Sequence, residues 1–180
     1  MIRLAFLTAV LMVGMLIGCT TFYQVRQADR QKVLQNSQSR LEQETLNNSD
    51  TITLKFLNQI KFYLGTPYKF GGDSRNGMDC SGFIATIFFE CFNIELPHNA
   101  YQIFQNCQEI PGQKLNLGDL VFFRNHGKID HVGIYLVKDY FVHASVSYGV
   151  IVSQLSEKYY RSRYFAAGRI VDFSIAGQQE

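Results

Sequence analysis

The spacing of apolar residues changes along this 180-residue chain. A largely apolar stretch over 4–17 is followed by residues 20–50, which are mostly Gln, Asn, Ser and charged residues. From residue 51 on, apolar residues recur at every third or fourth position, which is the period of a half-buried helix. This period, together with helix-capping residues, predicts helices over 51–64, 79–92 and 98–106.

Beyond residue 118 the apolar segments become short, β-branched or aromatic, and turn residues separate them. These features predict five strands, over 118–123, 131–137, 140–145, 149–155 and 164–171. Because helices come first and strands follow, we expect an α+β domain in which N-terminal helices pack on a C-terminal antiparallel sheet. We place this domain at residues 51–175.

The N-terminus has the pattern of an export signal. Arg3 precedes the apolar run, which is short for a membrane span and ends in "LIGC" at Cys19. This ending resembles a bacterial lipobox. The resemblance implies that residues 1–18 are removed as a signal peptide and that the Cys19 thiol is acylated. An ordinary signal peptide or a signal anchor is the alternative.

Residues 19–50 then read as a lipidated tether, because they hold too few large apolar side chains to offset the entropy of ordering. A coiled-coil helix is the alternative, although its apolar spacing is sparse. The residue after the cysteine is Thr20 and not Asp, which resembles the pattern of lipoproteins that are sorted to the outer membrane. We therefore expect a lipid-anchored protein of the cell envelope, on the periplasmic face of the outer membrane.

Charge and ligand patterns narrow the possible functions. The net charge is +2 and there is no basic run, so nothing favours nucleic-acid binding. The cysteines and histidines lack the spacing of metal ligands, and no glycine-rich phosphate loop is present. We expect no metal and no cofactor, and we expect a monomer.

Four cysteines are present, and lipidation of Cys19 would leave three. An odd number cannot all pair within one chain, so at least one thiol is free. Cys80 opens the second predicted helix directly after a capping residue, Asp79, where backbone N–H groups and the helix dipole lower a thiol pKa. Gly82 would leave room there for a substrate. A buried structural cysteine is the alternative for Cys80, and a Cys91–Cys107 disulfide also remains open.

Two of the four histidines lie on neighbouring predicted strands. Side chains alternate between the two faces of a sheet, so His131 and His143 share a face only under one of the two possible registers. In that register, the numbers of two residues paired across the neighbouring strands add up to an even number. A two-residue turn at 138–139 would pair 137 with 140 and separate them. We therefore expect a loop of odd length or a bulge near 137–140. His98 and His126 lie in predicted loops and are expected to be solvated.

The segments "LGTPYKFGGDSRNGMDCSGF", "LPHNAYQ", "LGDLVFF", "HVGIYLV" and "FVHAS" occur in this order. Over residues 52–172 they resemble the NlpC family of cell-wall cysteine peptidases, and within it the small lipoprotein murein endopeptidases. The resemblance implies a papain-like fold. It also implies that Cys80 is the nucleophile, that His131 is the base, that His143 orients the base, and that Tyr68 donates a hydrogen bond above the thiol.

Asp79 and Ser81 flank the nucleophile and are either cap residues or substrate contacts. The family implies a peptidoglycan hydrolase that cuts amide bonds in murein stem peptides or crosslinks through a thioester. Two alternatives come from other classes: a non-catalytic wall-binding lipoprotein, and an acyl or amide transferase that uses the same thioester.

Overall fold

A computed structural model describes residues 2–46, 50–111 and 114–170, with side chains from residue 24 on. The chain divides into a unit that ends at Val33 and a unit that begins at Leu34. In the first unit the described backbone is helical. The second unit contains the rest of the helices and all of the described strands.

Thirteen elements make up the described chain. The helices are α1 (Ile2–Leu46), α2 (Thr51–Tyr63), α3 (Cys80–Phe92), α4 (Ala100–Gln105) and α5 (Lys158–Arg161). The strands are β1 (Asp73–Ser74), β2 (Gly77–Met78), β3 (Gln108–Ile110), β4 (Leu120–Asn125), β5 (Lys128–Tyr135), β6 (Tyr140–Ser145), β7 (Gly149–Gln154) and β8 (Tyr164–Arg169).

One six-stranded sheet runs in the order β3-β8-β4-β5-β6-β7, and its strand pairs are antiparallel. The three predicted helices and five predicted strands of the domain are confirmed, with ends shifted by a few residues. The predicted α+β class is confirmed as well. The pattern missed four short elements, β1, β2, β3 and α5, because none of them is long enough to show a period.

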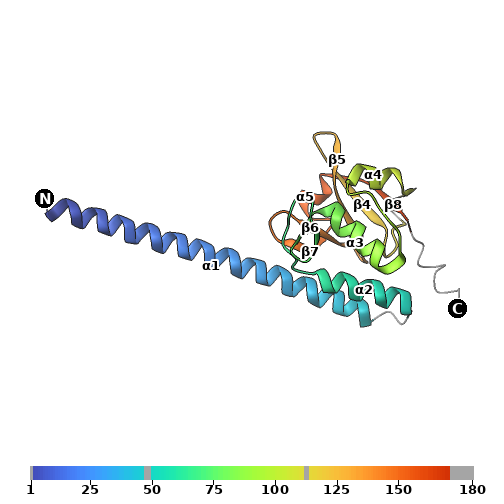
Figure 1. The fold of residues 1–180 in the computed structure, drawn as a ribbon, viewed down its shortest axis with the longest axis horizontal. Helices are drawn as coiled ribbons and strands as arrows, with labels where there is room; N and C mark the ends of the chain where they lie inside the picture. Colours follow the sequence, from blue (N-terminus) through green and yellow to red (C-terminus); the bar gives the residue numbers. More distant parts are fainter. Residues whose placement is uncertain (1, 47–49, 112–113, 171–180) are drawn as a thin grey trace. The chain divides into compact units, whose positions relative to one another are not determined.

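The sheet carries a separate apolar cluster on each face. On one face α3 packs against the sheet, and α2 and α4 flank it (Figure 1). The alternate residues Phe122, Val132 and Val142 point to this side. The other face carries Phe123 and Phe141, which pack against residues of the β7–β8 connection. Side chains of even and odd number on β4, β5 and β6 thus belong to different layers.

Capping residues explain where the helices begin and end. The carboxylate of Asp50 accepts the Thr53 N–H at 2.8 Å and caps the start of α2. At the C-terminal end of α3, Asn93 takes the left-handed conformation with φ of 56°, which Asn tolerates better than most residues. The helix therefore ends there, ahead of the loop that leads to α4.

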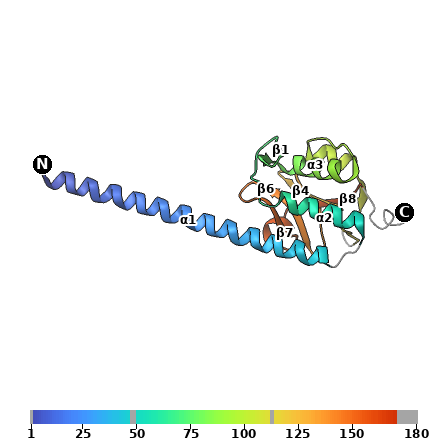
Figure 2. The same cartoon turned by 60° about the horizontal axis from the view of Figure 1, so that its bottom comes forward.

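The last part of α1 differs from the expected flexible tether. Leu41 is completely buried in the core, and Ser37 accepts the backbone N–H of Val152 on the edge strand β7 at 3.0 Å. Figure 2 shows this end of α1 alongside α2 and β7. Residues 34–46 thus belong to the folded unit. A few well-placed side chains suffice to dock a helix whose apolar residues are sparse.

The predicted lipidation site lies outside this description, because side chains before residue 24 are not described. Residues 171–175 of the expected domain also lie outside it. Among the described residues no helix has both the length and the hydrophobicity that crossing a membrane requires.

Replacing Leu41 tests the docking of α1. We expect Leu41→Ala to lower the free energy of unfolding by about 2–5 kcal/mol, because a buried leucine leaves a cavity when truncated. Leu46→Ala is the matched control, since Leu46 is 86% exposed on the same helix. Urea unfolding of the full chain measures both. Equal stability of the two variants would show that this helix does not hold the domain together.

Candidate active site

Cys80 lies at the start of α3 and is 8% exposed. The preceding residue, Asp79, caps the helix: its Oδ1 accepts the Gly82 N–H and the Ser81 hydroxyl, each at 2.8 Å. Its Oδ2 accepts the Gly71 N–H at 2.7 Å. Asp79 thus joins the helix to the preceding loop. Asp79 and Ser81 are both buried and bonded to each other, an arrangement that favours the cap over substrate contact.

Gly82 has a different role from the one expected. A Cβ added at this position would collide with the backbone carbonyl of Gly72. The missing side chain therefore lets the loop of residues 65–79 press against the first turn of α3. Close packing of backbone on backbone, and not space for a substrate, accounts for glycine here.

The loop of residues 65–79 holds Tyr68 beside the cysteine. The N–H of Met78 bonds to the carbonyl of Pro67, and the N–H of Lys69 bonds to the carbonyl of Met78, each at 3.0 Å. These two bonds hold the residues on both sides of Tyr68 against Met78, which lies two residues before Cys80. Burial raises the pKa of the Tyr68 hydroxyl, and negative charge at Cys80 and Asp79 raises it further. A hydroxyl that stays protonated next to a thiol is available as a hydrogen-bond donor.

The sulfur of Cys80 lies against the backbone of β5. Its Sγ is 3.9 Å from the carbonyl oxygen of Asp130, and the backbone N–H of Val132 also bonds to it. These two residues flank His131. Within the described residues the hydrogen bonds of Sγ are to backbone groups, and none is to the imidazole of His131. The geometry brings the thiol to the strand segment that carries the histidine.

Burial dominates the ionisation of Cys80. Desolvation raises the pKa of the thiol to about 11, although the N–H groups of Val132, Ser81 and Cys80 itself lower it. The expectation of a lowered thiol pKa from the helix N-terminus is therefore wrong for this state of the protein. The thiol is neutral near neutral pH, and a thiolate forms only if a base removes the proton.

The two histidines meet as the loop argument predicts. Ile134 pairs with Val142 and Tyr135 with Phe141, so the sum of paired residues is even and an odd number of residues, five, separates the last pair. His131 Nε2 and His143 Nδ1 are 2.8 Å apart. Since Nε2 of His131 is engaged with His143, the nitrogen left for the thiol is Nδ1.

Gly133 makes room for this pair. It lies on β5 between the two histidines, and a Cβ there would be 2.6 Å from the Phe141 ring and 3.1 Å from the Cβ of His143. Any larger residue at position 133 would collide with the Phe141 ring and with the backbone carbonyl of Val142, which is 2.9 Å away, directly before His143. The glycine of "HVG" thus has a packing reason that periodicity alone does not reveal.

The imidazoles lie on the sheet face opposite to α3. His131 is 5.8 Å from the ring of Phe123, and His143 stacks on Phe141 at 4.9 Å between ring centroids. The thiol meets the backbone of β5 at Asp130 and Val132, the two residues that flank His131. The two histidines share one sheet face, as predicted. The helix that carries Cys80 covers the opposite face, which was not predicted.

The apolar surroundings hold both histidines neutral. Burial lowers the pKa of His131 to about 4, while the charge of Asp79 raises it slightly. Burial, and next the charge of His131, lower the pKa of His143 well below its usual value. Near neutral pH the site therefore contains a neutral thiol next to a pair of neutral imidazoles.

Two hydroxyl groups reach the far nitrogen of His143. Tyr160 Oη lies 3.0 Å from Nε2, and Ser153 Oγ lies 3.2 Å from it. The sequence reasoning missed both residues, because Ser153 lies inside a regular strand and Tyr160 in a four-residue helix. The segment "KYYR" in a polar connection gives no signal of its own.

The remaining candidates stay apart from this site. Cys91 and Cys107 are both free thiols, so the alternative of a disulfide between them is not realised. His126 is exposed in the β4–β5 turn, as expected, and His98 is also exposed. Among the described residues no three His, Cys, Asp or Glu side chains gather as they would around a metal ion.

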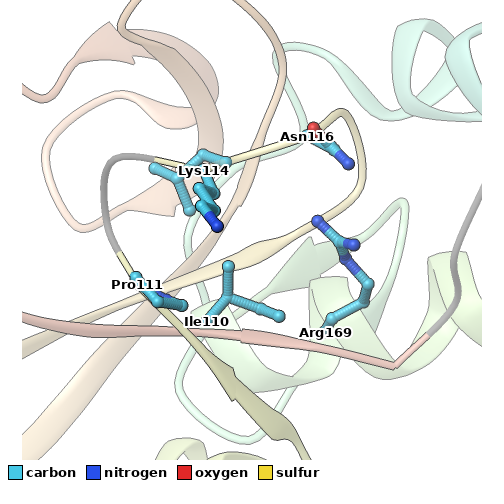
Figure 3. Close-up of a pocket in the computed structure, with 6 residues that line it drawn as sticks. Ile110, Pro111, Lys114, Asn116 and Arg169 are labelled. Atoms are coloured by element: carbon cyan, nitrogen blue, oxygen red, sulfur yellow. The ribbon is translucent and has the colours of Figure 1, made fainter.

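A pocket elsewhere on the domain is unrelated to the cysteine. It lies beside β3 and the end of β8 (Figure 3) and is lined by Ile110, Pro111, Lys114, Leu115, Asn116 and Arg169. The Arg169 guanidinium is engaged by Asp119 through contacts of 2.6 and 2.9 Å. None of the described residues that line it is a cysteine or a histidine.

The fold and the site together define a papain-like cysteine peptidase. A family model, described as the NlpC/P60 family, matches residues 65–169. The chain therefore belongs to the NlpC/P60 family, as its motifs suggested.

Individual relatives agree with this assignment. The Murein DD-endopeptidase MepS/Murein LD-carboxypeptidase of Escherichia coli K12 is 38% identical over 141 residues, which cover 78% of this chain and 74% of that protein. A probable endopeptidase NlpC homolog of Haemophilus influenzae is 42% identical over 109 residues, 61% of this chain and 58% of the homolog. Among solved structures, an NlpC/P60 family protein of Bacillus cereus superposes with a TM-score of 0.62 at 30% identity, covering 66% of this chain and 40% of that longer one.

The histidine pair predicts a loss of stability in acid. The unfolded chain binds protons at histidines below pH 6.5, whereas folded His131 resists protonation down to about pH 4. Unfolding therefore takes up protons in this window, so stability falls as the pH falls, by up to about 1.4 kcal/mol per pH unit for each such group. Above the window the effect is absent.

We expect that His143→Asn unfolds with the uptake of about one proton fewer, so that its unfolding free energy depends less steeply on pH between about pH 4 and 6.5. Urea unfolding at several pH values in this range measures the slope. His126→Asn is the control, because His126 is exposed, and it should keep the wild-type slope. Identical slopes in wild type and His143→Asn would mean that His143 is not held neutral by the fold.

Proposed function

We propose that this chain is a peptidoglycan hydrolase, a cysteine endopeptidase that cleaves amide bonds in murein stem peptides or crosslinks through a thioester on Cys80. One observation carries the proposal: the Cys80 sulfur lies at the head of a helix, against the strand segment of a histidine that is bonded to a second histidine. The name of the Escherichia coli relative, a murein endopeptidase, gives the substrate class.

The first half of the reaction forms the thioester. Because thiol and imidazole are both neutral, Nδ1 of His131 takes the proton as the sulfur attacks the carbonyl carbon, which is general-base catalysis. His143 holds the imidazolium that forms through the contact to Nε2. The C–N bond then breaks, and His131 returns its proton to the leaving amine.

The second half regenerates the enzyme. Water attacks the thioester carbonyl with His131 as base, the C–S bond breaks, and the thiol leaves with a proton. In both halves a negative oxygen develops on the carbonyl. The amide N–H of Cys80 and the hydroxyl of Tyr68 are the donors proposed to stabilise it. Asp79 and Ser81 support the helix start, and a direct contact to substrate is the alternative for them.

Replacing the nucleophile tests this proposal. We expect Cys80→Ala to release no fragments from purified sacculi, while wild type and Cys91→Ala release the same fragments. Mass spectrometry of the released muropeptides measures this. Hydrolysis adds one water to each cleaved bond, whereas transfer would add the acceptor amine, so the same spectra separate hydrolase from transferase. Retained turnover in Cys80→Ala would reject the mechanism, and an inactive wild type that still binds sacculi would favour the wall-binding alternative.

We also propose that the chain is attached to the membrane at its N-terminus. Residues 1–18 act as a signal peptide, Cys19 carries the lipid, and residues from 20 on link it to the catalytic domain. The support is the lipobox-like "LIGC". Several acyl chains on one residue would anchor the protein stably. Thr20 after the cysteine favours the outer membrane, so the enzyme would act from its periplasmic face on the polymer beside it. The enzyme is proposed to act as a monomer.

Replacing Cys19 tests the anchor. We expect Cys19→Ser to lose incorporation of labelled palmitate and to leave the membrane fraction, whereas Cys107→Ser keeps both. Cell fractionation followed by immunoblotting measures the distribution. A Cys19→Ser protein that is still labelled and still in the membrane fraction would reject lipidation at this residue.

A further inference from the structure

The buried nitrogen Nε2 of His143 faces two hydroxyl groups. Tyr160 Oη lies 3.0 Å and Ser153 Oγ 3.2 Å from this nitrogen. His143 is 1% exposed and Ser153 is 7% exposed. The family relation assigns no function to Tyr160 or Ser153. Both belong to the β7–β8 half of the chain, far in sequence from the cysteine.

The protonation pattern of the two imidazoles follows from their contact. For His131 to act as a base, its Nδ1 must carry no proton, so its Nε2 carries one and donates to Nδ1 of His143. His143 then carries its own proton on Nε2, and this N–H needs an acceptor. In the opposite pattern His143 donates to His131, and His131 cannot accept the thiol proton.

We infer that Tyr160 and Ser153 are positioning residues: in the reactive tautomer their oxygens accept the Nε2–H of His143 and thereby stabilise that tautomer. A buried N–H without an acceptor is costly, whereas the same N–H bonded to a hydroxyl oxygen is not. Through the His143–His131 contact, this choice leaves Nδ1 of His131 bare for the thiol proton.

The surroundings hold the Tyr160 hydroxyl in place. Its ring packs edge-on against Phe141 at 4.9 Å and lies 5.6 Å from Phe123, between ring centroids. Burial raises the pKa of this phenol to about 12, while a hydrogen bond with Ser153 lowers it. The phenol is therefore neutral over the working range of a periplasmic enzyme, and its oxygen keeps a lone pair for His143.

This inference rests on the proposed function, because it concerns the base of that reaction. The two fail in different ways. If the wild-type chain releases no fragments from sacculi, the proposed function fails. If wild type is active and loss of both hydroxyls leaves its turnover unchanged, only the role of Tyr160 and Ser153 fails.

The kinetic test uses Tyr160→Phe, Ser153→Ala and the double variant, with crosslinked muropeptides as substrate. Each single variant retains one acceptor, so we expect kcat to fall only a few-fold. We expect the double variant to lose on the order of 10- to 100-fold in kcat with KM unchanged. The acid limb of its kcat profile should move to lower pH by about one unit for each tenfold loss. Tyr159→Phe is the matched control, since Tyr159 is the exposed neighbour of Tyr160 and faces Arg163.

A second readout does not depend on turnover. In wild type, ¹⁵N chemical shifts of the imidazoles should show a protonated Nε2 and a bare Nδ1 on His143, and the double variant should populate the opposite pattern. Tyr160→Phe with Ser153→Thr keeps one hydroxyl and should show the wild-type pattern, which makes it the matched control for the double variant. If Ser153→Ala does not fold, Tyr160→Phe with Ser153→Cys replaces the hydroxyl by a much weaker acceptor of similar size and should also populate the opposite pattern. Unchanged shifts and an unchanged kcat in the double variant would overturn the inference, as would a bare Nε2 in wild type.

Discussion

The contact between His131 and His143 is the interaction on which the rest of the site depends. It exists because five residues separate the last paired residues, Tyr135 and Phe141, and so set an even register that places both imidazoles on one sheet face. It also needs Gly133, since a side chain there would collide with the Phe141 ring and the Val142 carbonyl on the neighbouring strand. One loop length and one glycine thus decide which nitrogen of His131 remains for the thiol.

The cysteine and the histidines belong to different layers of the domain. Cys80 enters from the helical layer and meets the backbone of β5, whereas the imidazoles lie among Phe123, Phe141 and Tyr160 on the other face. This separation explains the charge state of the site. Each partner is desolvated in its own layer, so the thiol keeps its proton and the imidazole stays neutral. In the mechanism that we propose, the ion pair would form only as the substrate carbonyl is attacked.

Much of this arrangement could be predicted from the sequence, for reasons that are local. Asp50 and Asp79 mark helix starts through cap bonds within three residues, and alternation marks the strands. The even register followed from requiring His131 and His143 to share a face. What could not be predicted depends on tertiary contacts. Burial reverses the expected pKa of Cys80, the backbone of Gly72 explains Gly82, and Leu41 docks a helix that composition assigned to a tether. Tyr160 reaches His143 from a helix too short to leave a pattern.

The claim that thiol and imidazole act as a pair is tested most directly by the alkylation of Cys80. Iodoacetamide modification is measured by peptide mass spectrometry in wild type, His131→Ala and the exposed-loop control His126→Ala, with Cys91 and Cys107 as internal references. The account predicts that near neutral pH His131→Ala slows the modification of Cys80 while leaving the two reference cysteines unchanged, because the base that removes the thiol proton is gone. Equal rates of Cys80 modification in wild type and His131→Ala would contradict it.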